Sequence, residues 1–429
     1  MKINIKFKLI LIFMSLCLIL ISCNSANNEI VVDKQRILTW MKFYGGEKND
    51  KAYSISQTTD GGYIVVGETN SYYSSFVKAD IIILKIGPNG ELEGVRETYG
   101  GHEYDRAYSI QQTKDGGYIV AGEADVSENF TTGKMWILKL NSKRKIEWEK
   151  KYSSGEYDRA YSIQQTKDGG YIVAGGVGPL NFPSKMHILK LDSNGEKEWE
   201  KFYIGNDSDS ANGAYSIQQT KDGGYIVAGR ASSNSNVETN MIVLKLDLDG
   251  EVEWQFIYEG EENEFNKAYS IQQTTDGGYI VAGEEGHCGE SSDAIVLKIN
   301  KNGKIEWQKA VYSVDNEWSR ANSIQQTKDG GYIVAGETDN ICDNRIFILK
   351  LDSNAEKKWE KVYDKIAGCA DKIKCSANSI QQTKDGGYIV AGWVKLTEDN
   401  SQDILILKLD ENGEIPRNNY NCLCNSSNE

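Results

Sequence analysis

One sixteen-residue stretch recurs along the chain at an almost constant interval. Its clearest copy runs from Ala107 to Gly122 and reads A-Y-S-I-Q-Q-T-K-D-G-G-Y-I-V-A-G. Seven copies are present, centred on Asp60, Asp115, Asp168, Asp222, Asp276, Asp329 and Asp385. A fixed period of just over fifty residues indicates an array, a solenoid or a propeller.

Each repeat contains the patterns of four short strands and no helical pattern. Residues Tyr108–Thr113 alternate large and small side chains, and Tyr118–Ala121 is almost wholly apolar, as in a strand covered on both faces. An apolar run such as Met186–Leu191 and an aromatic run such as Glu198–Tyr203 complete a unit. Four antiparallel strands in each of seven units predict an all-β fold, a seven-bladed β-propeller.

Two hairpin signals connect these strands, Asp-Gly inside the motif and Asn-Gly before the aromatic run. Asp-Gly predicts a type I′ turn, in which both central residues have positive φ. A two-residue turn at Asn-Gly would place Lys190 directly across from Trp199 as a cation–π pair, and the same count holds in four other units. Arg144 and Ala355 replace the glycine in two units, so each should carry positive-φ strain if the turn is kept.

The two ends of the repeat array complete one another. Residues Thr39–Tyr44 match an aromatic fourth strand, whereas the last unit stops after a third strand, Asp403–Asp410. Pro416 follows shortly and cannot donate to a ladder. We therefore predict that the first segment joins the last unit and closes the ring, which removes exposed sheet edges. The propeller would span residues 37–415, and residues 416–429 would be a polar tail.

Residues 1–22 have the pattern of an export signal. Three lysines precede an uncharged run from Leu9 to Ile21, which is shorter than the roughly 20 apolar residues of a spanning helix. The following L-I-S-C sequence, ending at Cys23, resembles the bacterial lipoprotein cleavage box. The resemblance implies that Cys23 is acylated and anchors the chain in the cell envelope, at the outer membrane or cell surface, with residues 23–36 as a tether. An ordinary signal peptide with an incidental cysteine is the alternative.

The repeat itself resembles a family of seven-bladed propeller repeats in bacterial surface and secreted proteins. The shared motifs are D-G-G-Y-x-V-x-G and L-K-L-D-x-N-G-x-x-x-W, and the similarity covers residues 37 to about 415. The resemblance implies that the S-I-Q-Q-T strand lines a central channel and that the tryptophan strand is outermost. It implies no particular activity, because propellers host many functions.

Charge argues against several classes of partner. Without the three lysines of residues 1–22, 45 basic residues stand against 62 acidic ones, a net charge of −17. Nucleic-acid binding needs a basic footprint, and adhesion to anionic lipid needs a polybasic segment. We expect no nucleic-acid partner, membrane contact only through the lipid on Cys23, and a monomer.

Basic and acidic residues vary together between the units. The base that heads the first strand would lie diagonally opposite the residue that ends the second strand, which favours local salt bridges over an anion-binding ring. The four predicted pairs are Lys51 with Glu68, Arg106 with Glu123, Lys267 with Glu284, and Arg320 with Glu337. Arg159 and Arg230 lack this acidic partner in the sequence.

Connections of variable length emerge on the face opposite the tight hairpins, and such loops usually carry function. The candidate binding patch consists of Tyr72, Tyr73, Phe76, Phe130, Arg159, Phe182 and Arg230. Aromatic and cationic side chains suit a glycan or a protein partner. The alternative is that these loops pack on themselves.

Six cysteines follow Cys23, and export permits disulfides. Cys369 and Cys375 bracket a short insertion and form the first candidate pair, and Cys288 with Cys342, in matching loops of adjacent units, forms the second. No cysteine or histidine spacing matches a zinc site, so we assign no metal.

We expect a non-catalytic binding or scaffold module. The sequence has no nucleophile elbow, zinc signature or phosphate loop, so we assign neither a catalytic residue nor a cofactor. The alternative is an extracytoplasmic glycan hydrolase or lyase that uses carboxylates on the variable-loop face. A quinone-dependent dehydrogenase is a third possibility, through fold analogy alone.

Overall fold

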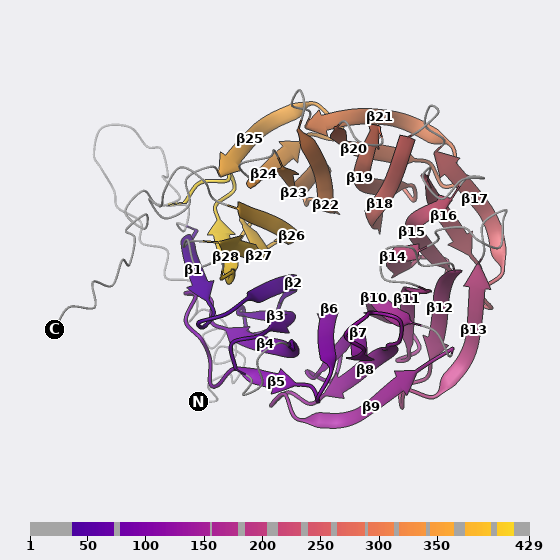
Figure 1. Cartoon of the computed structure of the whole chain (residues 1–429). Coiled ribbons are helices and arrows are strands. Elements are labelled where there is room, and N and C mark those ends of the chain that lie inside the picture. Colours follow the sequence, from indigo (N-terminus) through magenta and orange to yellow (C-terminus); the bar gives the residue numbers. More distant parts are fainter. Residues whose placement is uncertain are drawn as a thin grey trace, which may run out of the picture. The chain divides into compact units, whose positions relative to one another are not determined.

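Antiparallel four-stranded sheets account for the regular structure of the chain (Figure 1). The computed structural model describes residues 37–72, 78–154, 157–178, 185–203, 213–232, 239–258, 264–287, 291–312, 317–339, 344–363, 374–395 and 401–415. The chain divides into Met1–Ile37 and Leu38–Glu429, and the second unit contains all the strands. No helix occurs in the described ranges.

The strands fall into four classes by their position in a sheet. The first strands are β2 (Asp50–Gln57), β6 (Tyr104–Gln112), β10 (Asp158–Gln165), β14 (Gly213–Gln219), β18 (Glu264–Gln273), β22 (Trp318–Gln326) and β26 (Lys374–Gln382). The second strands are β3 (Tyr63–Thr69), β7 (Tyr118–Val126), β11 (Tyr171–Val177), β15 (Tyr225–Ser232), β19 (Tyr279–His287), β23 (Tyr332–Asp339) and β27 (Tyr388–Lys395).

The third strands are β4 (Asp80–Ile86), β8 (Lys134–Leu140), β12 (Lys185–Leu191), β16 (Thr239–Leu246), β20 (Ser292–Ile299), β24 (Asn344–Leu351) and β28 (Asp403–Leu409). The fourth strands are β5 (Glu97–Tyr99), β9 (Ile146–Tyr152), β13 (Lys197–Tyr203), β17 (Val252–Tyr258), β21 (Ile305–Tyr312), β25 (Lys357–Tyr363) and β1 (Trp40–Tyr44). The strand β1 pairs with β28 in antiparallel register, with Trp40 opposite Lys408 and Tyr44 opposite Ile404. Single parallel bridges, Thr239 to Phe265 and Ser292 to Trp318, join three neighbouring sheets.

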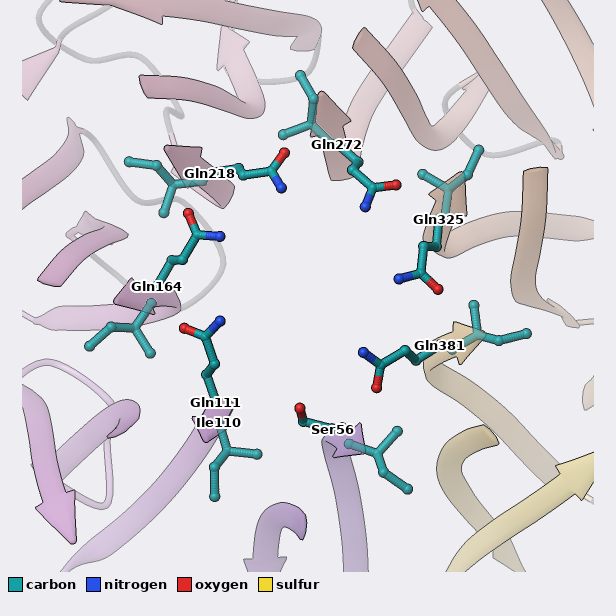
Figure 2. Close-up of a pocket in the computed structure, with 14 residues that line it drawn as sticks. Ser56, Ile110, Gln111, Gln164, Gln218, Gln272, Gln325 and Gln381 are labelled. Carbon is teal, nitrogen blue, oxygen red and sulfur yellow. The ribbon is translucent and has the colours of Figure 1, made fainter. Parts of the chain in front are cut away.

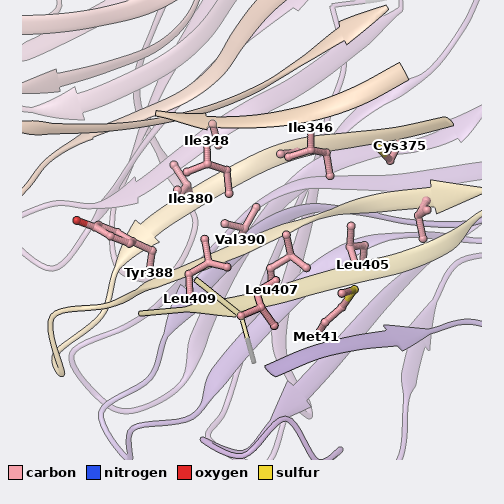
Figure 3. Close-up of a cluster of buried hydrophobic side chains, with 14 of the residues drawn as sticks. Met41, Ile346, Ile348, Cys375, Ile380, Tyr388, Val390, Leu405, Leu407 and Leu409 are labelled. Carbon is pink, nitrogen blue, oxygen red and sulfur yellow. The ribbon is translucent and has the colours of Figure 1, made fainter. Parts of the chain in front are cut away.

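The hydrophobic core lies between neighbouring sheets. Second and third strands are buried almost throughout, because both of their faces are covered by adjacent sheets. Figure 3 shows one such layer, in which Met41 of β1, Ile348 of β24 and Leu407 of β28 belong to a single cluster. Fourth strands such as β9 and β13 are only half-buried, which explains their mixture of charged and aromatic residues, whereas β1 is mostly buried.

The first strands surround a central channel (Figure 2). An isoleucine and the next residue of each first strand line a cavity of about 260 Å³. Radial four-stranded sheets with their first strands at a channel are the arrangement of a β-propeller. The S-I-Q-Q-T segment therefore has the innermost position that the family resemblance implied.

The Asp-Gly turns differ from the predicted type I′ geometry. In the turn of Thr113–Gly117, the N–H of Gly116 donates to the carbonyl of Thr113 and the N–H of Thr113 donates to that of Gly117, both at 2.9 Å. Only the first glycine of each such turn has positive φ, 83° at Gly116, and none of the turn aspartates does. This geometry is that of a longer loop with a glycine bulge. The type I′ prediction was wrong, because the Asp115 carboxylate instead accepts bonds from the Thr113 hydroxyl and the Gly117 N–H.

The third-to-fourth turns keep the predicted strand register but not the predicted two-residue turn. The N–H of Gly195 donates to the Asp192 carbonyl at 3.2 Å, and the N–H of Asp192 donates to the Glu196 carbonyl at 2.9 Å, so the loop is longer, and a bulge between Lys190 and Leu191 restores the register. Lys190 lies opposite Trp199, and the same pairing recurs in the four other predicted units. Arg144 and Ala355 have φ of 61° and 63°, as predicted. The buried ammonium groups, however, contact carboxylates: Lys190 Nζ lies 3.1 Å from Asp168 and 2.8 Å from Glu198. The indole instead packs edge-on against the next sheet, so ion pairs take the place of the predicted cation–π contact.

Candidate functional site at the loop-side end of the channel

The loop-side end of the channel is formed by the first residues of the first strands. Five tyrosines occupy one position there, and successive rings lie 5.2 to 5.8 Å apart between centroids: Tyr53, Tyr108, Tyr161, Tyr215 and Tyr269. Asn322 and Asn378 hold this position in the other two units. Their side-chain amides donate to backbone carbonyls of the next first strand at 3.0 and 2.8 Å. The result is an aromatic arc completed by polar contacts.

All four predicted salt bridges are present beside this arc. The nitrogen–oxygen distances are 3.2 Å for Lys51–Glu68, 2.9 Å for Arg106–Glu123, 2.7 Å for Lys267–Glu284 and 2.5 Å for Arg320–Glu337. The partners are directly opposite rather than diagonal. The difference arises from a bulge in each first strand, such as that between Ala107 and Ser109, which shifts the register by one residue.

The ion pairs also connect neighbouring sheets. Arg106 reaches Glu68 of the preceding sheet at 2.5 Å as well as Glu123 of its own. Burial alone raises the pKa of Glu68, but the charges of Arg106 and Lys51 outweigh burial and hold this pKa below its usual value. Burial and the neighbouring carboxylate raise the pKa of Tyr108, whose hydroxyl donates to Glu123 at 2.8 Å. Glu68 and Glu123 thus both accept hydrogen bonds from fixed donors.

The ion pairs of these glutamates can be compared with what a glycosidase requires of its carboxyl groups. A retaining or inverting glycosidase needs two carboxyl groups facing the substrate, one acting as an acid. The four glutamates Glu68, Glu123, Glu284 and Glu337 are buried and each contacts a cation. All four carboxylates are therefore already engaged by a cation.

A pocket of about 200 Å³ opens between the starts of β18 and β22. Its lining residues are Phe265, Lys267, Glu284, Ser292, Trp318 and Arg320. The Phe265 and Trp318 rings stack with centroids 5.3 Å apart and planes 14° apart, and Lys267 Nζ lies 5.1 Å from the Phe265 centroid. Trp318 is 38% exposed. The pocket offers an aromatic wall beside cations on the loop side.

Sequence reasoning did not single out this pocket, although a signal for it exists. In or directly before four first strands, an aromatic residue stands two positions before the base: Tyr104–Arg106, Tyr157–Arg159, Phe265–Lys267 and Trp318–Arg320. Side chains two apart point to the same side of a strand. In three of these pairs the cation lies 4.4 to 5.6 Å from the ring of its own pair.

The four described members of the predicted patch differ in their burial. Tyr72 is 41% exposed, and its hydroxyl donates to the Gly45 carbonyl at 2.6 Å. Phe130 is half-buried against Tyr104, 5.5 Å between centroids. Arg159 and Arg230 are buried, so they lie behind the surface rather than on it. Tyr73, Phe76 and Phe182 lie outside the described residues.

Most of the cysteines with predicted roles also lie outside the described residues. Cys375 is buried at the start of β26, and its thiol donates to the Asn344 carbonyl at 3.1 Å. Cys23, Cys288, Cys342 and Cys369 lie outside the described residues, so both disulfides and the acylation stay predictions. Within the described ranges, no cluster of three or more His, Cys, Asp or Glu side chains is placed to hold a metal ion. No helix in those ranges is long and apolar enough to span a bilayer.

Comparisons with known proteins address the fold. No family model matches the chain, and no curated protein matches it. A solved Dyadobacter fermentans protein of unknown function is 11% identical, with a TM-score of 0.50 over 87% of this chain and 98% of that one. The β-propeller domain of a Pyrococcus furiosus trilobed protease is 10% identical, with a TM-score of 0.48 over 87% and 97%. A Bacteroides caccae protein of unknown function is 16% identical, with a TM-score of 0.41 over 66% and 88%. Identities this low extend to the fold alone.

Proposed function

We propose that the chain is a lipid-anchored, extracytoplasmic β-propeller of seven blades. In this proposal, residues 1–22 are a lipoprotein signal, 23–36 a tether from acylated Cys23, 37–415 the propeller and 416–429 a tail. The variable-loop face binds a glycan or a protein, without catalysis.

Ring closure is supported by contacts that β1 makes with the first unit. Trp40 packs edge-on against Tyr63, 6.0 Å between centroids, and the Tyr44 hydroxyl donates to the Gly90 carbonyl at 2.7 Å. Trp148 and Tyr152 of β9 make the same two contacts with the following unit. The fourth strand of the last blade thus behaves like an internal fourth strand.

The binding function rests on one observation, the stacked Phe265 and Trp318 pair beside Lys267 and Arg320. Aromatic faces bind the apolar faces of sugars and the side chains of proteins with little loss of conformational entropy. The neighbouring carboxylates are already ion-paired, which favours binding over hydrolysis.

A screen of residues 24–429 against immobilised glycans and envelope proteins tests this function. The Trp318→Ala variant should lose roughly tenfold or more in affinity for a hit, as expected for a central aromatic contact. Leu248→Ala is the matched control, because Leu248 is 60% exposed in a tight turn on the opposite face. Equal binding by both variants would refute the pocket, and glycan cleavage products in the assay would favour the hydrolase alternative.

Anchoring has its own test. Cells expressing the full chain should incorporate labelled palmitate into it, and Cys23→Ser should abolish the incorporation. Labelling that survives in Cys23→Ser would remove the anchor from the proposal.

A further inference from the structure

The orientation of the channel glutamines is set by the backbone of the next strand. Six amide side chains line the channel: Gln111, Gln164, Gln218, Gln272, Gln325 and Gln381. Each Oε1 accepts a hydrogen bond from a backbone N–H of the following first strand, at 2.6 to 2.9 Å. A flipped amide would set NH₂ against N–H, two donors with no acceptor between them.

This constraint turns the donor side of each amide to the lumen. Figure 2 shows the nitrogen of each labelled glutamine toward the middle of the channel, with the oxygen directed away from it. In the first unit Ser56 takes the glutamine's place. The lining therefore presents several side-chain N–H donors, whereas the oxygen of each of these amides already accepts a backbone hydrogen bond.

Cations surround the same end of the channel, at the tight turns that follow the first strands. Five exposed lysines each place Nζ on carbonyl oxygens of the next unit's turn, at 2.9 to 3.5 Å: Lys114, Lys167, Lys221, Lys328 and Lys384. Among the described residues, none of these five forms an ion pair within 4.0 Å. The turn aspartates are engaged elsewhere, as Asp115 is by Lys139 at 2.8 Å.

We propose that the tight-turn end of the channel binds a small oxyanion, such as phosphate or a carboxylate group. Neutral amide donors with cations around them favour a negative ligand, even on a chain with a net charge of −14. The cavity of about 260 Å³ holds an oxyanion together with several waters of roughly 30 Å³ each. This site is separate from the loop-side pocket and uses none of its residues.

Calorimetric titration of the full chain, purified in detergent, with inorganic phosphate at constant ionic strength tests the proposal. Wild type should bind phosphate saturably, and Lys167→Met with Lys221→Met should weaken binding at least fivefold. Lys150→Met with Lys201→Met is the matched control, because it removes the same charge from outer strands. A parallel titration with acetate separates carboxylate binding from phosphate binding, and saturable binding of either supports the site.

A gain-of-function variant keeps the test independent of lost stability. Ser56→Gln should add the missing amide and tighten binding about twofold or more. Absence of saturable binding of both anions would overturn the proposal. Equal weakening by the control pair would also overturn it, because the effect would then be one of overall charge.

Discussion

Replacing Trp40 with alanine should destabilise the whole Leu38–Glu429 unit. Trp40 is 3% exposed, packs on Tyr63 and donates from its indole N–H to the Pro88 carbonyl at 2.9 Å. A buried Trp→Ala change costs about 3–5 kcal/mol. Of this, the aromatic pair contributes about 0.5–1.5 kcal/mol and the hydrogen bond about 1 kcal/mol.

The expected shift in melting temperature follows from the size of the unit. An unfolding entropy of about 2.1 cal/mol/K per residue gives roughly 0.8 kcal/mol/K for roughly 390 residues. Trp40→Ala should therefore lower Tm by about 4–6 °C in scanning calorimetry, within a single transition. Trp40→Phe keeps one aromatic ring but loses the hydrogen bond and part of the buried indole, so it should lower Tm by less than Trp40→Ala does.

Trp318→Ala provides the control of the same residue type. Trp318 is 38% exposed, so its removal should lower Tm by less than about 2 °C. If Trp40→Ala lowers Tm no more than Trp318→Ala does, β1 contributes little to the stability of the fold, contrary to this prediction.

Two further predictions concern a buried carboxylate and a strained turn. Burial of the carboxyl, and then the charge of Asp105, raise the pKa of Asp80 to about 6. The folded state therefore binds this proton more tightly than the unfolded state does, and the free energy of unfolding falls as pH rises from about 4 to 6. Asp80→Asn should therefore be more stable than wild type at pH 7.5, by about 1–3 kcal/mol, and indistinguishable below pH 4; equal Tm differences at both values would contradict this. Ala355→Gly should stabilise by about 0.5–1 kcal/mol, since relief of the 63° φ exceeds the entropy cost of glycine, and a loss of stability in urea titration would show that the turn is unstrained.

Local pattern was enough to predict pairings within a repeat. The spacing of Lys190 and Trp199 gave their register, and covariation gave the Arg106–Glu123 and Lys267–Glu284 pairs. The Lys190–Trp199 pairing was predicted correctly although the turn is longer than predicted, because a bulge between Lys190 and Leu191 restores the register. The turn type was predicted wrongly because the side-chain bonds within the turn, from the Thr113 hydroxyl and the Gly117 N–H to the Asp115 carboxylate, were not considered.

Contacts between repeats were much harder to predict. Phe265 and Trp318 are 53 residues apart and meet only because β18 and β22 belong to adjacent sheets. The burial of Arg159 likewise depends on surrounding segments that a repeat pattern does not reveal. A pocket between β18 and β22 could therefore not be predicted from the pattern of a single repeat.

Zero-length carbodiimide cross-linking with mass spectrometry tests most directly whether β1 takes the place of a fourth strand. Lysines of fourth strands lie beside glutamates of the next unit, and two such pairs inside the array are positive controls: Lys150–Glu196 at 2.6 Å and Lys201–Glu251 at 2.5 Å. The equivalent pair for β1 is Lys42–Glu91 at 2.8 Å. Our account predicts a Lys42–Glu91 cross-link at a yield similar to the two controls. Recovery of both controls without any Lys42–Glu91 product would contradict the placement of β1 as a fourth strand.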